Sequence, residues 1–522
     1  MPTTLAIRMT RVEIHHPAPD AGSELANALF EPRDDWVVSE IALEPGPTSG
    51  QRFDLLEGPF DRWQRTLRFD ATTGSAVETI DFHIAAGILA RPFGLLYGWA
   101  LKRKAYATTA PFWAPPQRYD ARATRVYMLL IVATITAAYL GTLLSQTITF
   151  VADDFDASRR TQGLVTAMTR LGALIALAVV WAADRVGRRS MLLWAGTGAT
   201  VFAAVAALSP NIWFFGFAQL GSRGFATGFG LLIGVIAAEE SPAGSRAWTT
   251  AILALFAGLG SGMVLWMVPI ADAGIGYWRW LFVIALLALP VLWALRRRLP
   301  ESRRYESLES RGDDAAPITD EMKRRFAKLA IVGFALSMFA APSSNFQNEY
   351  LRDERGFSGT RISLFSSATN TPIGIGVAIF GPIADRRGRR LIGAIGVVGG
   401  VVFTVLRYGV DGPLMWVGGT LSTVIGAATI PALGVYGPEL FPTSRRGLAN
   451  GLLTCVAVVG SALGLFFVGE MSQRWSFGQT FAVLAIVPLL ATIVIGFYPK
   501  TANRALEDIN PEDAAGSMPP IL

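Results

Sequence analysis

The sequence predicts an all-α membrane protein with twelve transmembrane helices in two parallel six-helix repeats and a small α+β cytoplasmic extension at the N-terminus. Three observations predict this fold class. The 522 residues are 52% hydrophobic and only 16% charged, whereas soluble domains carry about 25% charged residues. Twelve long apolar segments follow one another after residue 125, and two motifs of the first half recur about 200 residues later.

The rare residues exclude several kinds of chemistry. The single cysteine, Cys455, lies in an apolar run, and the three histidines, His15, His16 and His83, all precede the first long apolar segment. We therefore expect no disulfide, no bound metal and no cofactor. The net charge of +6 is what the cytoplasmic loops of a membrane protein accumulate, so it does not indicate nucleic-acid binding. The extension shows no nucleophile–base pair, and no enzyme activity is expected.

Residues 1–120 form the predicted N-terminal extension. Alternating apolar and polar residues predict strands of an antiparallel sheet, at Trp36–Leu43, Trp63–Phe69 and Ala76–Phe82. An amphipathic helix is predicted over Ala85–Lys104, broken at Pro92. Arg91 in its middle argues against a membrane span, although a helix at the membrane interface stays open. Residues 105–122 are predicted to be a linker.

Each of the twelve apolar segments has roughly 19–25 residues, enough to cross a hydrocarbon core of about 30 Å as a helix. They are predicted at residues 126–150, 162–182, 190–208, 212–238, 247–271, 276–295, 329–349, 362–382, 391–409, 413–436, 447–469 and 477–498. The predicted domains are therefore an N-terminal six-helix bundle at 121–298, a cytoplasmic linker at 299–328, a C-terminal six-helix bundle at 329–500 and a cytoplasmic tail at 501–522.

Basic residues in the loops predict the orientation. With the N-terminus placed inside, the inner loops hold 20 Lys and Arg residues and the outer side holds 8. Positively charged loops stay in the cytoplasm, so both termini are expected there. No signal peptide is visible in the polar first 30 residues. The expected location is the plasma membrane, here a bacterial inner membrane.

The chain repeats two motifs. Ala183-Asp-Arg-Val-Gly-Arg-Arg189 recurs as Ala384-Asp-Arg-Arg-Gly-Arg-Arg390, and Glu239, Pro242 and Arg246 recur as Glu439, Pro442 and Arg446. Basic clusters that only enforce topology would explain the arginines, but not the matching Asp, Gly, Glu and Pro. The two offsets are nearly equal, which predicts two parallel six-helix halves.

These motifs resemble those of the major facilitator superfamily of transporters, over about 400 of the 522 residues. The Asp-Arg-x-Gly-Arg-Arg loops resemble the superfamily signature after spans 2 and 8. Trp278-Arg-Trp-Leu-Phe282, Pro300-Glu-Ser-Arg303 and Leu506-Glu-Asp-Ile509 resemble its sugar and metabolite porter branch. Span 7 lacks the double glutamine expected of sugar binding, and span 1 lacks a proton-coupling carboxylate.

The resemblance implies alternating access, in which two bundles rock around a midplane site. Charged pairs at the inner helix ends are then expected to latch and release the inner face, since exposed pairs cost little to break. The residues expected to act as this gate are Asp184, Arg185, Gly187, Arg188, Arg189, Glu239, Arg246, Glu301, Asp385, Arg386, Gly388, Arg389, Arg390, Glu439 and Arg446. A set of static surface pairs is the alternative interpretation.

Two arginines stand out inside the bilayer, Arg170 in span 2 and Arg223 in span 4. An arginine at a helix centre costs roughly 2.5–3.5 kcal/mol, so each must face water, a ligand or a partner. The partner is either a substrate anion or a carboxylate near the outer ends, namely Asp153, Asp154 or Glu349. The substrate site is predicted to combine both arginines with polar residues of spans 1, 7 and 8: Gln146, Asn345, Gln347, Asn348 and Asn370.

The extension weakly resembles the C-terminal part of a START-like helix-grip domain. Gly58-Pro-Phe60, Trp63-Gln-Arg65 and the strand that leads into the 85–104 helix carry this resemblance. It implies a pocket for an apolar ligand. A plain cytoplasmic appendage is the alternative.

The function predicted from these features is secondary active or facilitative transport of a small organic solute. An organic anion is favoured over a neutral sugar or an organic cation, because the two arginines make the predicted cavity electropositive. The alternative is a non-transporting ligand sensor built on a permease body. The expected partners are the small-molecule substrate and the lipid bilayer, with a coupling proton left open, and the protein is expected to be a monomer.

The topology can be tested directly with reporter fusions. Fusions after residues 190, 320 and 390 are expected to report a cytoplasmic location, and those after 156, 356 and 473 an external one. Enzymatic reporters that are active on only one side of the membrane make the measurement. An inverted pattern or an odd number of spans would contradict the two-repeat architecture.

Overall fold

The computed structural model describes residues 9–16, 29–43, 50–69, 75–87, 90–103, 114–115, 117–242, 245–301, 318–441 and 443–499. The predicted tail at 501–522 and most of the predicted linker at 299–328 lie outside these residues. The chain divides into two compact units, which are described separately. Unit 1 comprises residues 1–134, 233–256 and 294–306, and unit 2 comprises residues 135–232, 257–293 and 307–522.

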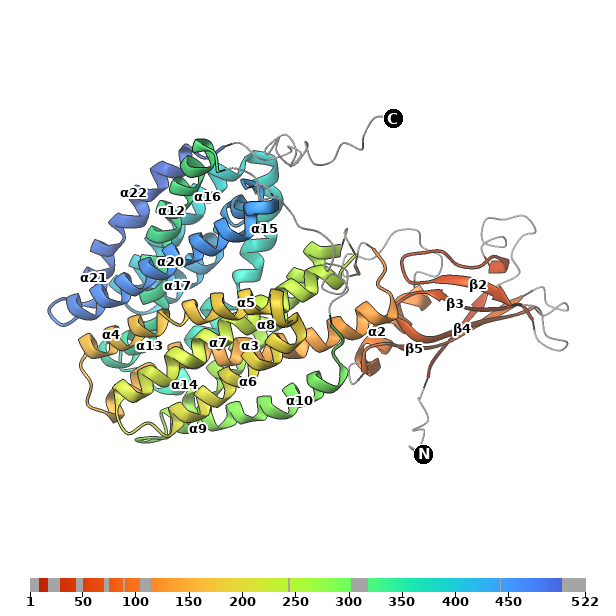
Figure 1. Cartoon of the computed structure of the whole chain (residues 1–522), viewed down its shortest axis with the longest axis horizontal. Helices are drawn as coiled ribbons and strands as arrows, with labels where there is room; N and C mark the ends of the chain where they lie inside the picture. The colour runs from red at the N-terminus through yellow and green to blue at the C-terminus, as the bar shows by residue number, and fades with distance from the viewer. Residues whose placement is uncertain are drawn as a thin grey trace. The chain divides into compact units, whose positions relative to one another are not determined.

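The extension in unit 1 contains one five-stranded antiparallel sheet, drawn in red and orange in Figure 1. Its strands are β1 (Thr10–His16), β2 (Ser39–Leu43), β3 (Arg52–Glu57), β4 (Phe60–Phe69) and β5 (Ala76–Ile84), in the order β1-β5-β4-β3-β2. Strands were predicted at the positions of β2, β4 and β5, and this is confirmed. Strands β1 and β3 were not predicted. Residues alternate between buried and half-buried along β5, as expected of a strand that covers a core with one face.

Helix α2 (Ala90–Arg103) closes this core. Its Leu101 is buried with Trp63 and Phe82 of the sheet, and α2 contacts β1 and β5. The predicted break at Pro92 is wrong, because α2 begins only at Ala90 and the proline falls in its first turn. There the missing N–H of proline costs no intrahelical hydrogen bond. The helix-grip resemblance remains a prediction.

The strands of the sheet also carry a buried network of charged side chains. The guanidinium of Arg65 pairs with Glu40 at 2.8 Å and with Glu78 at 3.7 Å, and all three side chains are fully buried. The indole nitrogen of Trp63 donates to Glu40 at 2.7 Å, and His16 lies 3.0 Å from Glu78. Buried charges persist in proteins only when they are paired in this way.

Unit 1 also contains the segment that leads into the first membrane helix, and this segment is bonded to the extension. The guanidinium of Arg118 pairs with Asp34 at 2.6 Å and donates to the carbonyl of Val38. This contact holds the pKa of the Asp34 carboxyl below its usual value. On its other side, the segment bonds the loop after span 4, where the backbone N–H of Gln117 donates to Ser245 at 2.8 Å.

The helices that follow build twelve spans, confirming the predicted fold class. Spans 1 to 6 are α3 (Ala121–Asp154), α4 (Arg159–Arg170) with α5 (Ala173–Val186), α6 (Arg188–Ala207), α7 (Ile212–Glu240), α8 (Arg246–Ala271), and α9 (Arg279–Ile284) with a 3-10 turn and α10 (Ala288–Arg298). Spans 7 to 12 are α12 (Asp320–Asn345) with α13 (Gln347–Glu349) and a π-helical turn (Tyr350–Glu354), α14 (Gly359–Asn370) with α15 (Ile373–Arg387), α16 (Arg389–Gly409), α17 (Pro413–Gly426) with α18 (Thr429–Leu433) and α19 (Tyr436–Glu439), α20 (Thr443–Met471), and α21 (Phe477–Leu484) with α22 (Ile486–Gly496).

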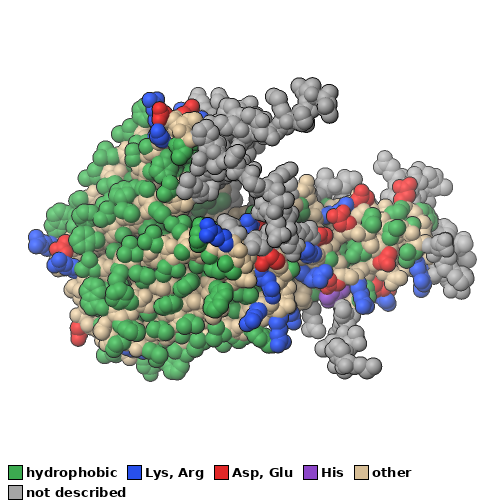
Figure 2. Space-filling model, viewed as in Figure 1, with side chains coloured by type: hydrophobic (Ala, Val, Ile, Leu, Met, Phe, Trp, Pro, Cys, Tyr) green, Lys and Arg blue, Asp and Glu red, His purple; other side chains and the backbone are tan. Residues whose placement is uncertain are grey.

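By length and composition, eleven helical segments among the described residues can cross a membrane. The remaining predicted span is present as α14 and α15, which are divided at Thr371-Pro372. Large apolar side chains stay exposed along the spans, as on Trp194 and Leu490, and Figure 2 shows hydrophobic side chains covering the visible flank of the helices. Such a surface is stable against lipid rather than water.

The internal repeat extends well beyond the two motifs. Span 2 is interrupted after Arg170 and span 8 after Asn370, at the same offset of 200 residues. At that offset, Ser158 and Ser358 both occupy the N-cap positions of these spans. The residue two positions before each cap has a positive φ, 47° at Asp156 and 64° at Gly356. Spans 2 and 8 therefore share their entry turn, their N-cap and their helix break.

The buried network generates a stability prediction. Arg65→Ala is expected to leave Glu40 and Glu78 buried without their shared cation, and to destabilise the extension by about 3–5 kcal/mol. Hydrogen exchange of the strand amides in the full-length protein measures this. Arg11→Ala is the matched control, because the Arg11 side chain is 65% exposed where it pairs with Asp81, and it should change exchange little. Equal exchange in the two variants would contradict the prediction.

Candidate functional site

The candidate site has three parts: the loops that carry the repeated motifs, two arginines inside unit 2, and a group of ion pairs at one end of the spans. We call the side on which span 1 begins the near side, and the side on which it ends the far side. The motif loops then lie on the near side, because they follow the even-numbered spans 2 and 8.

The glycines of the motif loops make tight turns between helices. Gly187 alone connects α5 to α6 with a φ of 108°, and Gly388 connects α15 to α16 with a φ of 97°. Side chains other than hydrogen disfavour this conformation. Each motif loop is therefore a turn of one glycine.

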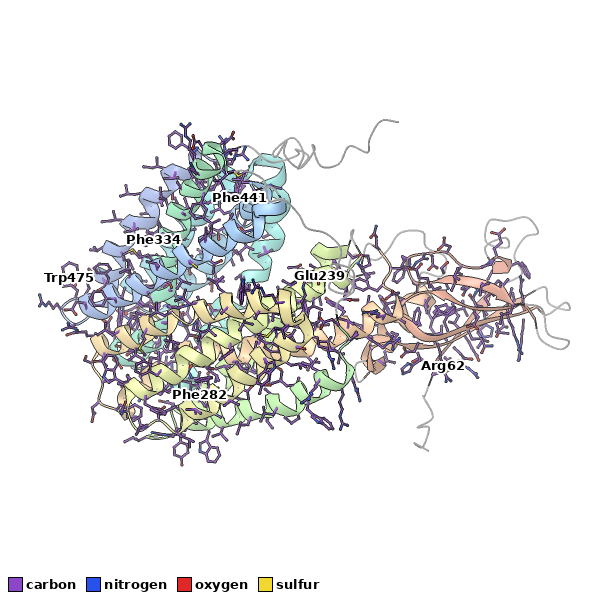
Figure 3. All side chains as sticks on the ribbon, viewed as in Figure 1. Arg62, Glu239, Phe282, Phe334, Phe441 and Trp475 are labelled. Carbon is purple, nitrogen blue, oxygen red and sulfur yellow. The ribbon has the colours of Figure 1, made fainter. Side chains whose placement is uncertain are left out.

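The charged gate residues lie at the predicted helix ends, but only part of their environment is described. Arg185 stacks on the ring of Trp181 at 3.8 Å, and Arg390 donates to the carbonyl of Gly496 at 3.4 Å. Glu239 lies in the last turn of α7, as Figure 3 shows, and the carbonyl of Glu301 accepts from Arg122. Side chains outside the described residues are those of Asp184, Arg246, Asp385, Arg386, Glu439 and Arg446.

Spans 2 and 4 touch backbone to backbone near the middle of the N-terminal half. A Cβ added to Gly172 would lie 2.5 Å from the carbonyl oxygen of Leu220, and one added to Gly224 would lie 2.5 Å from that of Gly172. Only glycine allows so close a crossing. The crossing brings Arg170 and Arg223 together, near enough for their positive charges to act on each other.

The carboxylates that the sequence offered as partners of these arginines are engaged elsewhere. Asp153 pairs with Arg352 at 2.7 Å, Asp154 with Arg279 at 2.5 Å, and Glu349 with Arg159 at 2.8 Å. Among the described residues, no carboxylate forms an ion pair with Arg170 or Arg223. Arg223 instead donates to the carbonyl oxygen of Gly141 in span 1 at 3.2 Å.

The predicted polar residues divide into two groups. The amide of Asn348 donates to the Gln146 side chain at 3.0 Å and so joins spans 1 and 7. Gln347 is buried, donates to Ser366 and accepts from Arg407 at 2.8 Å, and the Asn345 amide donates to Ala341 within its own helix. These amides have intramolecular partners. Asn370 is exposed at the end of α14, where the repeat has Arg170 in the other half.

Ion pairs join the two halves at the far side, and sequence reasoning did not predict this set. Besides Asp153–Arg352, the guanidinium of Arg159 pairs with Glu349 and, at 3.4 Å, with Asp353. Arg160 pairs with Glu470 at 3.2 Å. We call the set of Asp153, Arg159, Arg160, Glu349, Arg352, Asp353 and Glu470 the far gate. The signal in the sequence for these ion pairs was that acidic and basic residues both occur at the far ends of spans 1, 2, 7 and 11.

Backbone contacts reinforce the far gate. A Cβ added to Gly163 of span 2 would lie 2.8 Å from the carbonyl oxygen of Leu465 and 3.0 Å from Gly469, both in span 11. The backbone N–H of Gly359, at the start of span 8, donates to Asp272 of span 5 at 2.6 Å. A carboxylate at a helix N-terminus is favoured by the helix dipole. The far side is therefore closed by polar, helix-dipole and backbone contacts together.

Two repeated six-span halves, joined by ion pairs at one end and holding charged residues between their spans, define the class of alternating-access membrane transporters. The chain belongs to the Major Facilitator Superfamily, whose model matches residues 127–346 and 329–518.

Known relatives agree with this membership. The glucose transporter GlcP of Staphylococcus epidermidis is 24% identical over 74% of this chain and 96% of its own length. The cis,cis-muconate transport protein of Acinetobacter baylyi is 24% identical over 69% of this chain and 90% of its own. The inward open structure of the xylose transporter XylE from E. coli shares the fold, with a TM-score of 0.60 and 16% identity over 75% of this chain and 99% of that one. The chain thus transports a small organic solute and is not an enzyme.

The far gate yields a prediction with a built-in control. Arg159→Ala should leave the Glu349 carboxylate, whose side chain is only 3% exposed, without its paired cation. The closed far side should then be weakened by on the order of 2 kcal/mol. Arg160→Ala should do much less, because Arg160 and Glu470 are 59% and 41% exposed. The readout is the labelling rate of a cysteine at Ser363, a buried residue that bonds Leu265 across the halves, in a Cys455→Ser background. Equal labelling rates in both variants would show that this gate does not hold the closed state.

Proposed function

We propose that the protein transports a small organic anion across a bacterial inner membrane, and that Arg170 and Arg223 bind the anionic group. The observation that carries this proposal is the pair of neighbouring arginines, for which the described residues supply no carboxylate. The outer carboxylates that would have made them a structural ion pair belong to the far gate and to Arg279.

The energetics favour an anionic ligand. Each arginine costs roughly 2.5–3.5 kcal/mol at a helix centre, and the positive charge of Arg223 acts unfavourably on that of Arg170. A carboxylate bound between them offsets both terms, and its attraction is stronger there than in water because the local dielectric is lower. A neutral sugar would leave the repulsion in place, and an organic cation would increase it.

The relatives support a small organic substrate, but the substrates in their names differ in charge. The Acinetobacter relative carries muconate by its name, which is a dicarboxylate, whereas the Staphylococcus relative carries the neutral sugar glucose. For this chain, the arginine pair supports the anionic substrate. A non-transporting sensor is not favoured, because the chain covers these transporters over nearly their whole length.

The loop charges support an orientation for the chain, and the orientation names the state. With 20 Lys and Arg residues in the near-side loops against 8 on the far side, the near side is assigned to the cytoplasm with both termini. The closed far gate then corresponds to a state in which the outside is sealed. The near-side residues predicted as a gate, among them Asp184, Asp385, Glu239 and Glu439, would close the cytoplasmic face in the opposite state, in a monomer.

Substitution of the span 4 arginine tests the proposal. Arg223→Ala is expected to raise the Kd for a carboxylate substrate at least tenfold, which corresponds to about 1.4 kcal/mol. Arg223→Lys should restore part of the affinity, because it restores the charge. A thermal-shift screen of purified protein identifies the ligand, and counterflow in liposomes measures transport. Arg474→Ala, at an exposed far-side position, is the control. A cationic ligand, or unchanged affinity in Arg223→Ala, would contradict the proposal.

A further inference from the structure

The segment that precedes span 1 packs on the loop between spans 4 and 5. Tyr119 is 5% exposed, and its hydroxyl is hydrogen-bonded to Ser241 at 3.4 Å and to Thr249. Its ring packs against that of Trp248, with the ring centroids 5.9 Å apart. A buried tyrosine with a bonded hydroxyl is a strong anchor. In the N-terminal half, a side chain of the chain itself therefore covers this loop.

The C-terminal half differs at the corresponding positions. At the offset of 200 residues, Thr319 stands in place of Tyr119, Phe441 in place of Ser241 and Ala449 in place of Thr249. The Thr319 hydroxyl accepts from the backbone N–H of Met322 and so caps its own helix. A side chain of this size does not fill the volume that an aromatic ring fills in the other half.

An apolar cleft of about 190 Å³ lies at this place in the C-terminal half. Its walls come from Met322 and Phe326 of span 7, Ala449 of span 11, and Phe441, which Figure 3 labels. At its open edge, Ile318 and Leu452 are 57% and 48% exposed. Sites for whole organic ligands have volumes of about 300–1,000 Å³. The smaller cleft suits one or two apolar side chains instead.

We propose that the C-terminal tail docks in this cleft, with Leu506 and Ile509 as the side chains that fill it. Both belong to the motif Leu506-Glu-Asp-Ile509, to which the proposed substrate site gives no role. The tail itself lies outside the described residues. Docked, it joins the near ends of spans 7 and 11. The proposal does not depend on the transported solute.

The end of span 12 brings the tail to the cleft. The Nζ atom of Lys328 donates to the carbonyl of Phe497 at 3.0 Å, and the Tyr498 hydroxyl donates to the carbonyl of Lys328 at 3.4 Å. Lys328 follows Phe326, in the wall of the cleft, by two residues. The tail therefore begins beside the span 7 wall.

The tail is also long enough to reach the whole cleft. Leu506 follows Tyr498 by eight residues, and a chain of that length extends over up to about 26–29 Å. The ten residues that lead from Ile318 to Lys328 rise by only about 15 Å at the pitch of a helix. The docked segment is thus not restricted by the length of the chain before it.

Charges at the edge of the cleft match those of the tail. Lys323 is 65% exposed, and its pair with Asp320 on the surface costs little to break. Arg324 is exposed next to it. The tail segment places Glu507 and Asp508 between its two apolar residues, and residues 501–522 contain four carboxylates against one arginine. An acidic segment with apolar residues on either side of its charges is complementary to an apolar cleft with a basic edge.

Cysteine labelling tests the docking. The reporter is Ile318→Cys, at the edge of the cleft, in a full-length Cys455→Ser background in lipid nanodiscs. A membrane-impermeant maleimide should label it about tenfold faster when the chain ends at Lys500, because the tail no longer covers it. A factor of ten corresponds to about 1.4 kcal/mol. Ala327→Cys, exposed on the same helix, is the control reporter and should react equally in both chains.

Substitutions in the full-length chain separate docking from other effects of the shortened tail. Leu506→Asp with Ile509→Asp should give the fast labelling of the shortened chain, because an apolar cleft does not accommodate carboxylates. Met518→Asp with Ile521→Asp makes the same change farther along the tail. This control should keep the slow labelling of the parent.

A charge exchange tests the basic edge. Lys323→Glu with Arg324→Glu should speed the labelling of the Ile318→Cys reporter, because the tail then meets charges of its own sign. Adding Glu507→Lys and Asp508→Lys should restore slow labelling in that background. Such a restoration is specific to groups that interact with each other.

Equal labelling of the Ile318→Cys reporter in the full-length and shortened chains would overturn the proposal, and slow labelling in both would show that a lipid or another segment covers the cleft. An equal effect of the Met518 and Ile521 substitutions would overturn it as well, since the segment at 506–509 would then have no special role. These results leave the anion proposal intact, because that proposal is tested by ligand affinity in the Arg223 variants.

Discussion

The absence of water from the hydrocarbon core is the constraint on which the rest of the structure depends. It requires that every span bond its own backbone, so the chain crosses as helices. It also moves charges to the helix ends, where they pair across the two halves, as Arg159 does with Glu349. A charge that stays inside must therefore have a function or a partner. Arg170 and Arg223 have no such carboxylate partner among the described residues, which makes them the informative exception.

The repeat shows that the C-terminal half carries no arginine at the positions of these two. At the common offset, Arg170 corresponds to Asn370 and Arg223 to Thr423. Spans 2 and 8 share their break and their N-cap, so the two halves differ at this position in the charge that they carry rather than in their helix geometry.

Much of this was accessible from the sequence. The spans, the repeat and the turns at Gly187 and Gly388 follow from hydropathy, spacing and the steric needs of glycine. Strands β1 and β3 escaped prediction because each is short and places only two apolar residues on its core face, Val12 and Ile14 in β1 and Phe53 and Leu55 in β3. Pairing with β5 and β4 decides their conformation. The far gate escaped because its pairs join residues about 200 or more positions apart, and no local pattern specifies which arginine meets which carboxylate. Gln347 looked like a cavity residue for the same reason, since its partner Arg407 lies in another span.

The membrane potential bears on the proposed substrate class. Moving one negative charge inward against a potential of 100 mV, negative inside, costs about 2.3 kcal/mol. An organic anion carried alone would have to meet this cost from its own gradient. A monoanion that crosses together with one proton carries no net charge, so its inward movement is not opposed by the potential.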